Sequence, residues 1–332
     1  MTKTQAVDIH GRSYHRTIMF VLMMIATLAG SLMQSTLGTA LPTLMDKFSI
    51  DLNTAQQATT WFLLALGVMV PVSSYLVKKV PTKPLTIITY AFLLIGVLVT
   101  CLTPEKHDMW WMFVVGRVIA AAAVGISMPL LQIAIVNIYS KEERSFAMGL
   151  MGLVVGMSPA IGPTLTGWIL NRSHHFLGFT LPDNWQAIFY LPITILVVVL
   201  VLLPFFMRDI IPNEDVKLDF WSLLLSSFGF GLFLLGFTNV SNDGWSALLA
   251  VDAPIVIGLL LIIVFIWRQL KMEKPFLDVR VFKSWDFSVA TIAVSAVMMA
   301  MMGVEMMLPT YLQNIHGMSA LDSGLTLLPG AL

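Results

Sequence analysis

Charged residues are scarce in this 332-residue chain. They make up 11% of it, whereas apolar residues make up 57% and the mean hydropathy is +0.84. A soluble domain carries charge on about a quarter of its residues, so the composition excludes an ordinary soluble domain and indicates an integral membrane protein. The pI near 7 gives no sign of nucleic-acid binding, and no nucleic-acid partner is expected.

Cysteine is nearly absent as well. Cys101 is the single cysteine, which excludes an internal disulfide framework, and no Cys/His spacing suggests a metal site. The chain has no phosphate-binding glycine loop and no Ser/His/Asp grouping, so neither an enzyme nor a cofactor is expected. Residues 1–16 are polar and the apolar run after them lacks a small-residue cleavage site, so no signal peptide is visible.

Long apolar runs dominate the sequence instead. About 20 apolar residues cross a bilayer core as a helix, and the runs predict an all-α integral membrane protein with nine spans and the start of a tenth near residue 319. The predicted spans are 17–39, 57–77, 85–102, 111–137, 145–170, 186–207, 219–238, 252–268 and 286–312.

The basic residues divide unevenly between the two sides that these spans define. Of the 19 Lys and Arg residues, fifteen fall on the side of the N-terminus, three fall on the other side and Arg117 lies within a span. Because basic residues favour cytoplasmic loops, we expect a multi-pass protein of the plasma (cell) membrane with a cytoplasmic N-terminus.

The last apolar run ends after about nine residues. A helix that stops within hydrocarbon leaves carbonyl groups without partners, at a cost of several kcal/mol each. We therefore expect the sequence to be the N-terminal part of a longer protein.

The predicted span 145–170 is unusually rich in glycine and proline, in the stretch GLMGLVVGMSPAIGPTLTGW. At 100° per residue most of its small residues share one narrow arc, which lets another helix approach closely, and the prolines add a bend. Either a static close-packed pair or a gate with a hinge would use such a face. The residues of this candidate gating motif are Gly149, Gly152, Gly156, Pro159, Gly162, Pro163 and Gly167.

Two charged side chains lie inside predicted spans. Arg117 is costly within a bilayer and is expected to face the protein interior or a wet cavity, with Gln132 about 60° away on the same helix; the alternative is that it reaches the outer interface near Trp110. Glu305 shares a helix face with methionines, and an apolar setting disfavours the charged form of a carboxylate, which suits proton exchange. An interfacial position is equally open for Glu305.

A cavity for a substrate is expected between the polar and methionine-bearing faces of these spans. The span 17–39 carries a polar stripe that includes Gln34 and should line the interior, and polarizable methionines suit irregular apolar ligands. The candidate cavity residues are Thr27, Ser31, Trp61, Gln132, Met298 and Met302.

Several of these segments resemble a known family. SPAIGPTLTGW is similar to the antiporter motif G-P-x-x-G-G of the 14-helix drug:proton antiporters of the major facilitator superfamily, which include bacterial multidrug efflux permeases. Gly162, Pro163 and Gly167 match, while Thr166 replaces the first glycine of the final pair.

Further motifs carry the resemblance along the chain. GRVIAAAAVGISMPLL resembles the family's motif around Arg117, with Ala120 in place of the usual glutamine. LMQSTLGTALPTL resembles the motif of the first span, with Gln34 where an aspartate usually stands. The loop SSYLVKKVPTKPL has Lys78 in place of an aspartate but keeps the basic Lys79 and Lys83, and TYLQNIHGMSALDSGLTLLPG is similar to the junction of the ninth and tenth spans.

The resemblance implies the major facilitator fold and alternating access between two halves. It implies four segments: a cytoplasmic N-terminus (1–16), a six-helix N-terminal bundle (17–207), a linker with two extra transmembrane helices (208–270), and an incomplete start of the C-terminal bundle (271–332). The function implied is proton-coupled export of drugs or other amphipathic compounds. Small-molecule substrates, protons and the lipid bilayer would be its partners.

With Gln34 and Lys78 in place of carboxylates, Glu305 is the expected proton carrier and Arg117 its modulator. The span 145–170 would lie at the sliding interface between the halves. The alternative is a truncated membrane fragment of such a permease that does not transport.

Overall fold

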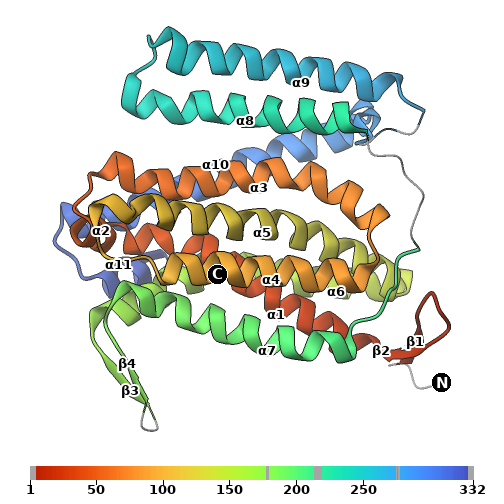
Figure 1. Ribbon diagram of the computed structural model, residues 1–332, viewed down its shortest axis with the longest axis horizontal. Coiled ribbons are helices and arrows are strands. Elements are labelled where there is room, and N and C mark those ends of the chain that lie inside the picture. Colours follow the sequence, from red (N-terminus) through yellow and green to blue (C-terminus); the bar gives the residue numbers. More distant parts are fainter. Residues whose placement is uncertain (1–4, 177–178, 213–218, 274, 276, 328–332) are drawn as a thin grey trace.

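The computed structural model describes residues 5–176, 179–212, 219–273, 275 and 277–327. It is almost entirely helical, and its long helices run roughly parallel or antiparallel to one another (Figure 1). Within the described ranges nine helical segments are long and apolar enough to cross a membrane. The all-α membrane fold and the number of spans predicted from the apolar runs are confirmed.

The first predicted span, 17–39, covers one helix but only the beginning of the helix that follows it. The chain forms α1 (Arg16–Ser35), breaks direction at Thr36 and continues as α2 (Leu37–Phe48), in which Pro42 is an interior residue. Proline usually ends a helix because it removes a backbone hydrogen bond. Here α2 packs against α3, α6 and α10, and this tertiary packing outweighs the local cost.

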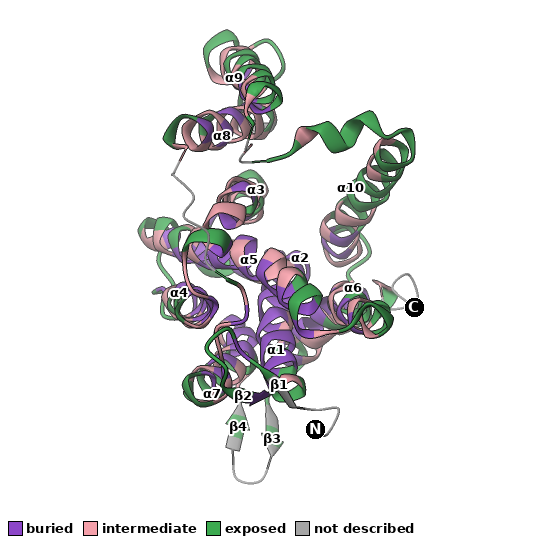
Figure 2. Ribbon diagram, turned by 90° about the vertical axis from the view of Figure 1, so that its right-hand side faces the viewer, coloured by how far each residue is buried: buried purple, intermediate pink, exposed green. Residues whose placement is uncertain are grey.

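The first six spans form a bundle in which α1 is central (Figures 1 and 2). Its other helices are α3 (Leu52–Lys79), α4 (Thr82–Cys101), α5 (Trp110–Ile138), α6 (Lys141–Asn171) and α7 (Tyr190–Phe206); the 3-10 turns η1 (His107–Met109) and η2 (Trp185–Phe189) precede α5 and α7. At Gly96 a Cβ atom would meet the backbone of Ala120, so α4 and α5 are in backbone contact there.

An aromatic cluster fixes one end of this bundle. The rings of Trp110 and Phe113 stack with centroids 4.7 Å apart, and Phe48 and Trp185 contact them edge-on or tilted at 5.1 to 6.0 Å. Aromatic pairs at such distances are worth about 0.5–1.5 kcal/mol beyond their buried area. The end of α2 is thereby tied to α5 and to the start of α7.

The two extra helices pair with each other beside α3 (Figure 1). They are α8 (Phe220–Asp243) and α9 (Ala253–Lys271), joined through a π-helical turn η3 (Leu248–Asp252). Arg268 donates to the Asp219 carboxylate at 2.8 Å. Burial pushes the pKa of Asp219 upward, but the hydrogen bonds from Arg268 and Ser222 outweigh this and hold the pKa below its usual value.

The chain then passes through a 3-10 turn, η4 (Val279–Lys283), into α10 (Trp285–Asn314) and α11 (Ala320–Leu327). The helix α10 lies apart from most of the bundle and contacts it mainly at α2, while α11 packs on α6 (Figure 2). The side chains of α10 are consequently far more exposed than those of α1.

Two short antiparallel hairpins interrupt the helical architecture. One pairs β1 (Gln5–Val7) with β2 (Ser13–His15), and the other pairs β3 (His174–Phe176) with β4 (Phe179–Leu181). Apolar periodicity in the sequence did not indicate either, because each strand has only three residues. The β1–β2 hairpin is held to the segment after α7 by a hydrogen bond from the Ile9 amide to the Asp209 carbonyl, at 3.2 Å.

Candidate functional site

Glu305 lies where α10 crosses the six-helix bundle. A Cβ atom on Gly38 of α2 would stand 2.7 Å from the Glu305 carbonyl oxygen, so the two backbones touch at this point. The Glu305 side chain is 8% exposed, and its Oε1 atom has no hydrogen-bond partner among the described residues. Glu305 is therefore enclosed by protein rather than presented on the outer surface of α10.

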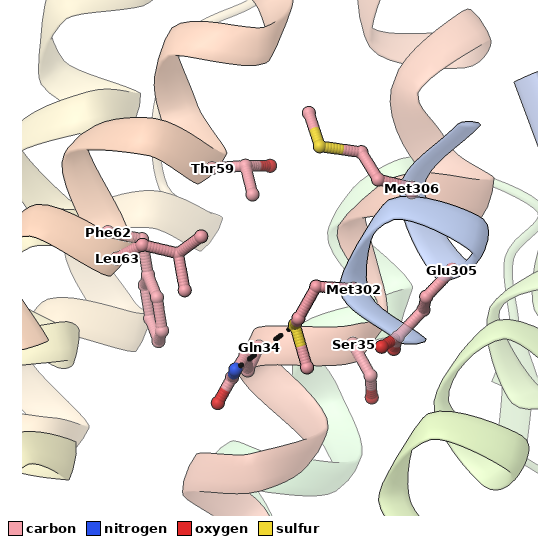
Figure 3. Close-up of a pocket in the computed structure, with 9 residues that line it drawn as sticks. Gln34, Ser35, Thr59, Phe62, Leu63, Met302, Glu305 and Met306 are labelled. Atoms are coloured by element: carbon pink, nitrogen blue, oxygen red, sulfur yellow. Dashed lines mark hydrogen bonds between the residues drawn. The ribbon is translucent and has the colours of Figure 1, made fainter. Parts of the chain in front are cut away.

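A small cavity of about 50 Å³ lies beside this contact and is lined by residues of α1, α2, α3 and α10. Figure 3 shows Met302 and Glu305 of α10 reaching toward Gln34 and Ser35 of α1, with α3 on the opposite side. The Gln34 amide donates to the Met302 sulfur at 3.7 Å. The cavity is lined by Gln34, Ser35, Gly38, Thr59, Phe62, Leu63, Met302, Glu305 and Met306.

A second and larger cavity, of about 350 Å³, lies between α6, α10 and α11. Glu305 lines it too, together with Pro159 of α6, Leu327 of α11 and further residues of α10 such as Met301. One unpaired carboxyl group therefore borders both cavities.

Arg117 is buried in the bundle at 1% exposure, which excludes the alternative that it reaches the interface. Its Nη1 group donates to the Met33 carbonyl oxygen, and the guanidinium carbon stands 4.2 Å from the centroid of the Phe62 ring. The Nε and Nη2 groups have no partner among the described residues.

The polar stripe of the first span divides between two environments. Thr27 and Ser31 are buried inside the bundle, and the Thr27 hydroxyl lies 3.4 Å from the Tyr90 hydroxyl. Gln34 and Ser35, one to two turns further on, line the cavity. Neither Thr27 nor Ser31 lines either of the two cavities beside Glu305.

The remaining candidate cavity residues lie elsewhere. Gln132 and Met298 are exposed, Met298 with 49% of its surface accessible, and Trp61 is half-buried. None of the three lines the two cavities, whereas Met302 does. Sequence reasoning missed Thr59, Phe62 and Leu63, which share one side of α3; the same helical-arc argument, applied to the predicted span 57–77, could have found them.

The glycine and proline residues of α6 have two different surroundings. A Cβ atom on Gly162 would meet the Ser35 hydroxyl, and one on Gly167 would meet the backbone of α11 at Ala320. Gly149, Gly152 and Gly156 have no atom within 4 Å of such a Cβ among the described residues. Pro163 also belongs to the contact, since its carbonyl oxygen would stand 2.5 Å from a Cβ on Gly324.

The basic loop between α3 and α4 lies at the end of the bundle that carries the β1–β2 hairpin. Lys78 and Lys79 are exposed. Lys83 donates through Nζ to the Pro204 carbonyl at 2.7 Å, and its amide donates to the Asp209 carboxylate at 2.8 Å. The loop is therefore fastened to the end of α7. No cluster of His, Cys, Asp and Glu side chains that could hold a metal lies in the described ranges.

Comparison with known families identifies the fold. A model of the Major Facilitator Superfamily matches residues 23–332. The chain belongs to this superfamily. Its members are transporters rather than enzymes, and the superfamily's multi-pass helical fold agrees with the nine apolar helices of the described residues.

Two curated relatives and one solved structure show how far the similarity extends. The chain is 34% identical over 325 residues to the uncharacterized MFS-type transporter YcnB of Bacillus subtilis, covering 98% of this chain and 66% of YcnB. It is 33% identical over 309 residues to the lincomycin resistance protein LmrB of Listeria innocua, covering 93% of this chain and 62% of LmrB. The chain thus spans slightly under two thirds of their length.

A crystal structure of a peptide transporter, POT, superimposes with a TM-score of 0.59 at 12% identity, covering 92% of this chain and 64% of that one. At this level of identity the likeness concerns the fold alone. Of the two relatives, LmrB is the one whose name refers to drug resistance.

Proposed function

We propose that this superfamily member exports drugs or other amphipathic compounds across the plasma membrane by proton-coupled alternating access, with a cytoplasmic N-terminus. The observation that carries the proposal is the unpaired carboxyl group of Glu305, which borders both cavities at the contact between the N-terminal bundle and α10. A buried carboxyl group without a partner is costly when charged. Its protonation state therefore couples to how closely α10 approaches the bundle.

We propose that different segments of the chain form the two walls of the cavities. The bundle (17–207) forms one wall of the cavities, the extra helices (208–270) flank α3, and the segment 271–332 supplies the opposite wall. In major facilitator transporters, substrate and coupling-ion sites lie near the midplane between such repeats. The name of LmrB supports a drug-like substrate, and the methionines at 301, 302 and 306 supply adaptable apolar contacts.

A comparison of Glu305→Gln with Glu273→Gln tests the proposal. The second change has the same chemistry at an exposed position beyond α9. We expect cells that express the gene to pump out ethidium or lincomycin in an uncoupler-sensitive way, and Glu305→Gln to abolish this export while substrate exchange without a gradient persists. Full, uncoupler-sensitive export by Glu305→Gln would remove Glu305 from the mechanism.

A further inference from the structure

Phe62 contacts one buried charged side chain and shares a cavity with another. Its ring is completely buried, lines the cavity that Glu305 also lines, and contacts the guanidinium of Arg117. Arg117 itself is not among the residues that line this cavity. The ring therefore belongs to the part of the cavity wall that touches Arg117. Figure 3 shows Phe62 on the α3 side of this cavity and Glu305 on the α10 side.

Arg117 is incompletely satisfied in this position. Of its five N–H donors, one on Nη1 reaches the Met33 carbonyl oxygen, and Nε and Nη2 have no partner among the described residues. The face of the Phe62 ring attracts the guanidinium but accepts none of these hydrogen bonds as a carboxylate would. An arginine keeps its charge in almost any protein environment, so a carboxylate within reach would bind it strongly.

Glu305 is the acidic side chain that lines the cavity on the other side of the ring, and its Oε1 atom is likewise without a partner among the described residues. Two opposite charges held apart in an apolar interior attract strongly once nothing lies between them. A side chain that separates Arg117 from Glu305 would therefore control when the two can form an ion pair. Phe62 lines the cavity and its ring also contacts Arg117; Leu63, the next residue of α3, lines the same cavity.

We propose that Phe62 is a positioning residue that shields Arg117 from Glu305, and that displacement of its ring joins the cavity to the arginine so that the two side chains pair. The role of this pairing in proton coupling rests on the proposed function. Rotation of α3 against α10 would displace the ring, and the pair would form only in that conformation. The ionised state of Glu305 would then be tied to one arrangement of the helices.

Two double-mutant cycles test the shield without measuring transport. Each combines Arg117→Met with Glu305→Gln, once in the natural chain and once in Phe62→Ala, and follows the thermal midpoint of the purified protein by tryptophan fluorescence at mildly alkaline pH. In the natural chain we expect the two shifts to add to within about 1 °C, because side chains that do not interact have additive effects. In Phe62→Ala we expect a departure from additivity of several degrees, since the pair can form.

Matched variants separate shielding from a general loss of packing. Phe62→Leu keeps an apolar barrier without an aromatic face and should stay additive, as should Leu63→Ala. Should Phe62→Ala not fold, Phe62→Val serves as the opened variant. Two results would overturn the proposed shielding role of Phe62: additive midpoint shifts in Phe62→Ala, or strongly non-additive shifts already in the natural chain. Because no transport enters these cycles, their outcome is independent of whether Glu305→Gln abolishes export.

Discussion

The two halves of α6 make opposite use of the same glycine-rich face. Toward its C-terminal end, Gly162 and Gly167 let α1 and α11 approach so closely that a Cβ atom would overlap them. Toward its N-terminal end, Gly149, Gly152 and Gly156 face open space among the described residues. Pro159 lies between the two halves, and Pro163 lies within the C-terminal one. The difference shows that a smooth helix face does not by itself imply contact.

Under the alternating-access proposal, this asymmetry is the expected property of one state. The contact at Gly167 closes the end of the molecule that carries α2 and α11, while the other end of α6 stands open beside the β1–β2 hairpin (Figure 1). In the opposite state the open glycines would take up the close contact. Substitutions along the face should therefore affect stability in one half and transport in the other.

The largest loss of stability is expected from Gly167→Leu. A side chain here overlaps the backbone of Ala320 and Leu321, which cannot move aside as a flexible side chain can. Overpacking of this kind costs about 1–3 kcal/mol, and we expect the upper end. The thermal midpoint of the purified protein measures it, with Gly152→Leu as the control, since a Cβ atom there meets no atom of the described residues within 4 Å. Equal midpoints for the two variants would contradict the contact.

Gly162→Ala should have an intermediate effect. Its new methyl group meets the Ser35 hydroxyl, which at present donates to the Ser158 carbonyl at 2.9 Å. Losing that buried hydrogen bond costs about 1–3 kcal/mol. In a Ser35→Gly background, which has already lost this hydrogen bond and both colliding side-chain atoms, Gly162→Ala should lower the thermal midpoint little further. An equally large drop in that background would show that the methyl group collides with something else.

The smallest effect on stability is expected from Gly152→Ala. No atom of the described residues lies within 4 Å of the added methyl group, and alanine favours a helix over glycine by up to about 1 kcal/mol. The midpoint should stay constant or rise. Export should nevertheless fall if this part of α6 has to close against another helix. A variant with unchanged export would confine the gating role to the half that contains Gly162 and Gly167.

The number of spans could be predicted from the sequence, but the surroundings of the side chains on each span could not. Apolar runs are long and unambiguous, so nine spans were predicted and confirmed within the described residues. The polar stripe from Thr27 to Gly38 was extrapolated as one straight helix, whereas the chain breaks at Thr36. Within α1 itself Thr27 and Ser31 are buried in the bundle whereas Gln34 lines the cavity, which Gly38 lines from beyond the break.

The candidate site was partly visible in the sequence because charges inside apolar spans are rare. Arg117 and Glu305 stood out on this ground alone. The apolar side of the site did not stand out, since Phe62 is one of 20 phenylalanines and its importance comes from contact with Arg117 across helices. Contacts between distant segments are set by packing, which no periodicity in a single span encodes.

Distance measurements across both ends of α6 test the central claim most directly. Spin labels at Arg172 and Asn314 report the closed end, and labels at Ser145 and Ala290 report the open end; all four residues are exposed, and Cys101 would be replaced by serine. We predict that substrate and a change of pH lengthen the first distance while shortening the second. Distances that stay fixed, or that change in the same direction, would contradict alternating closure along α6.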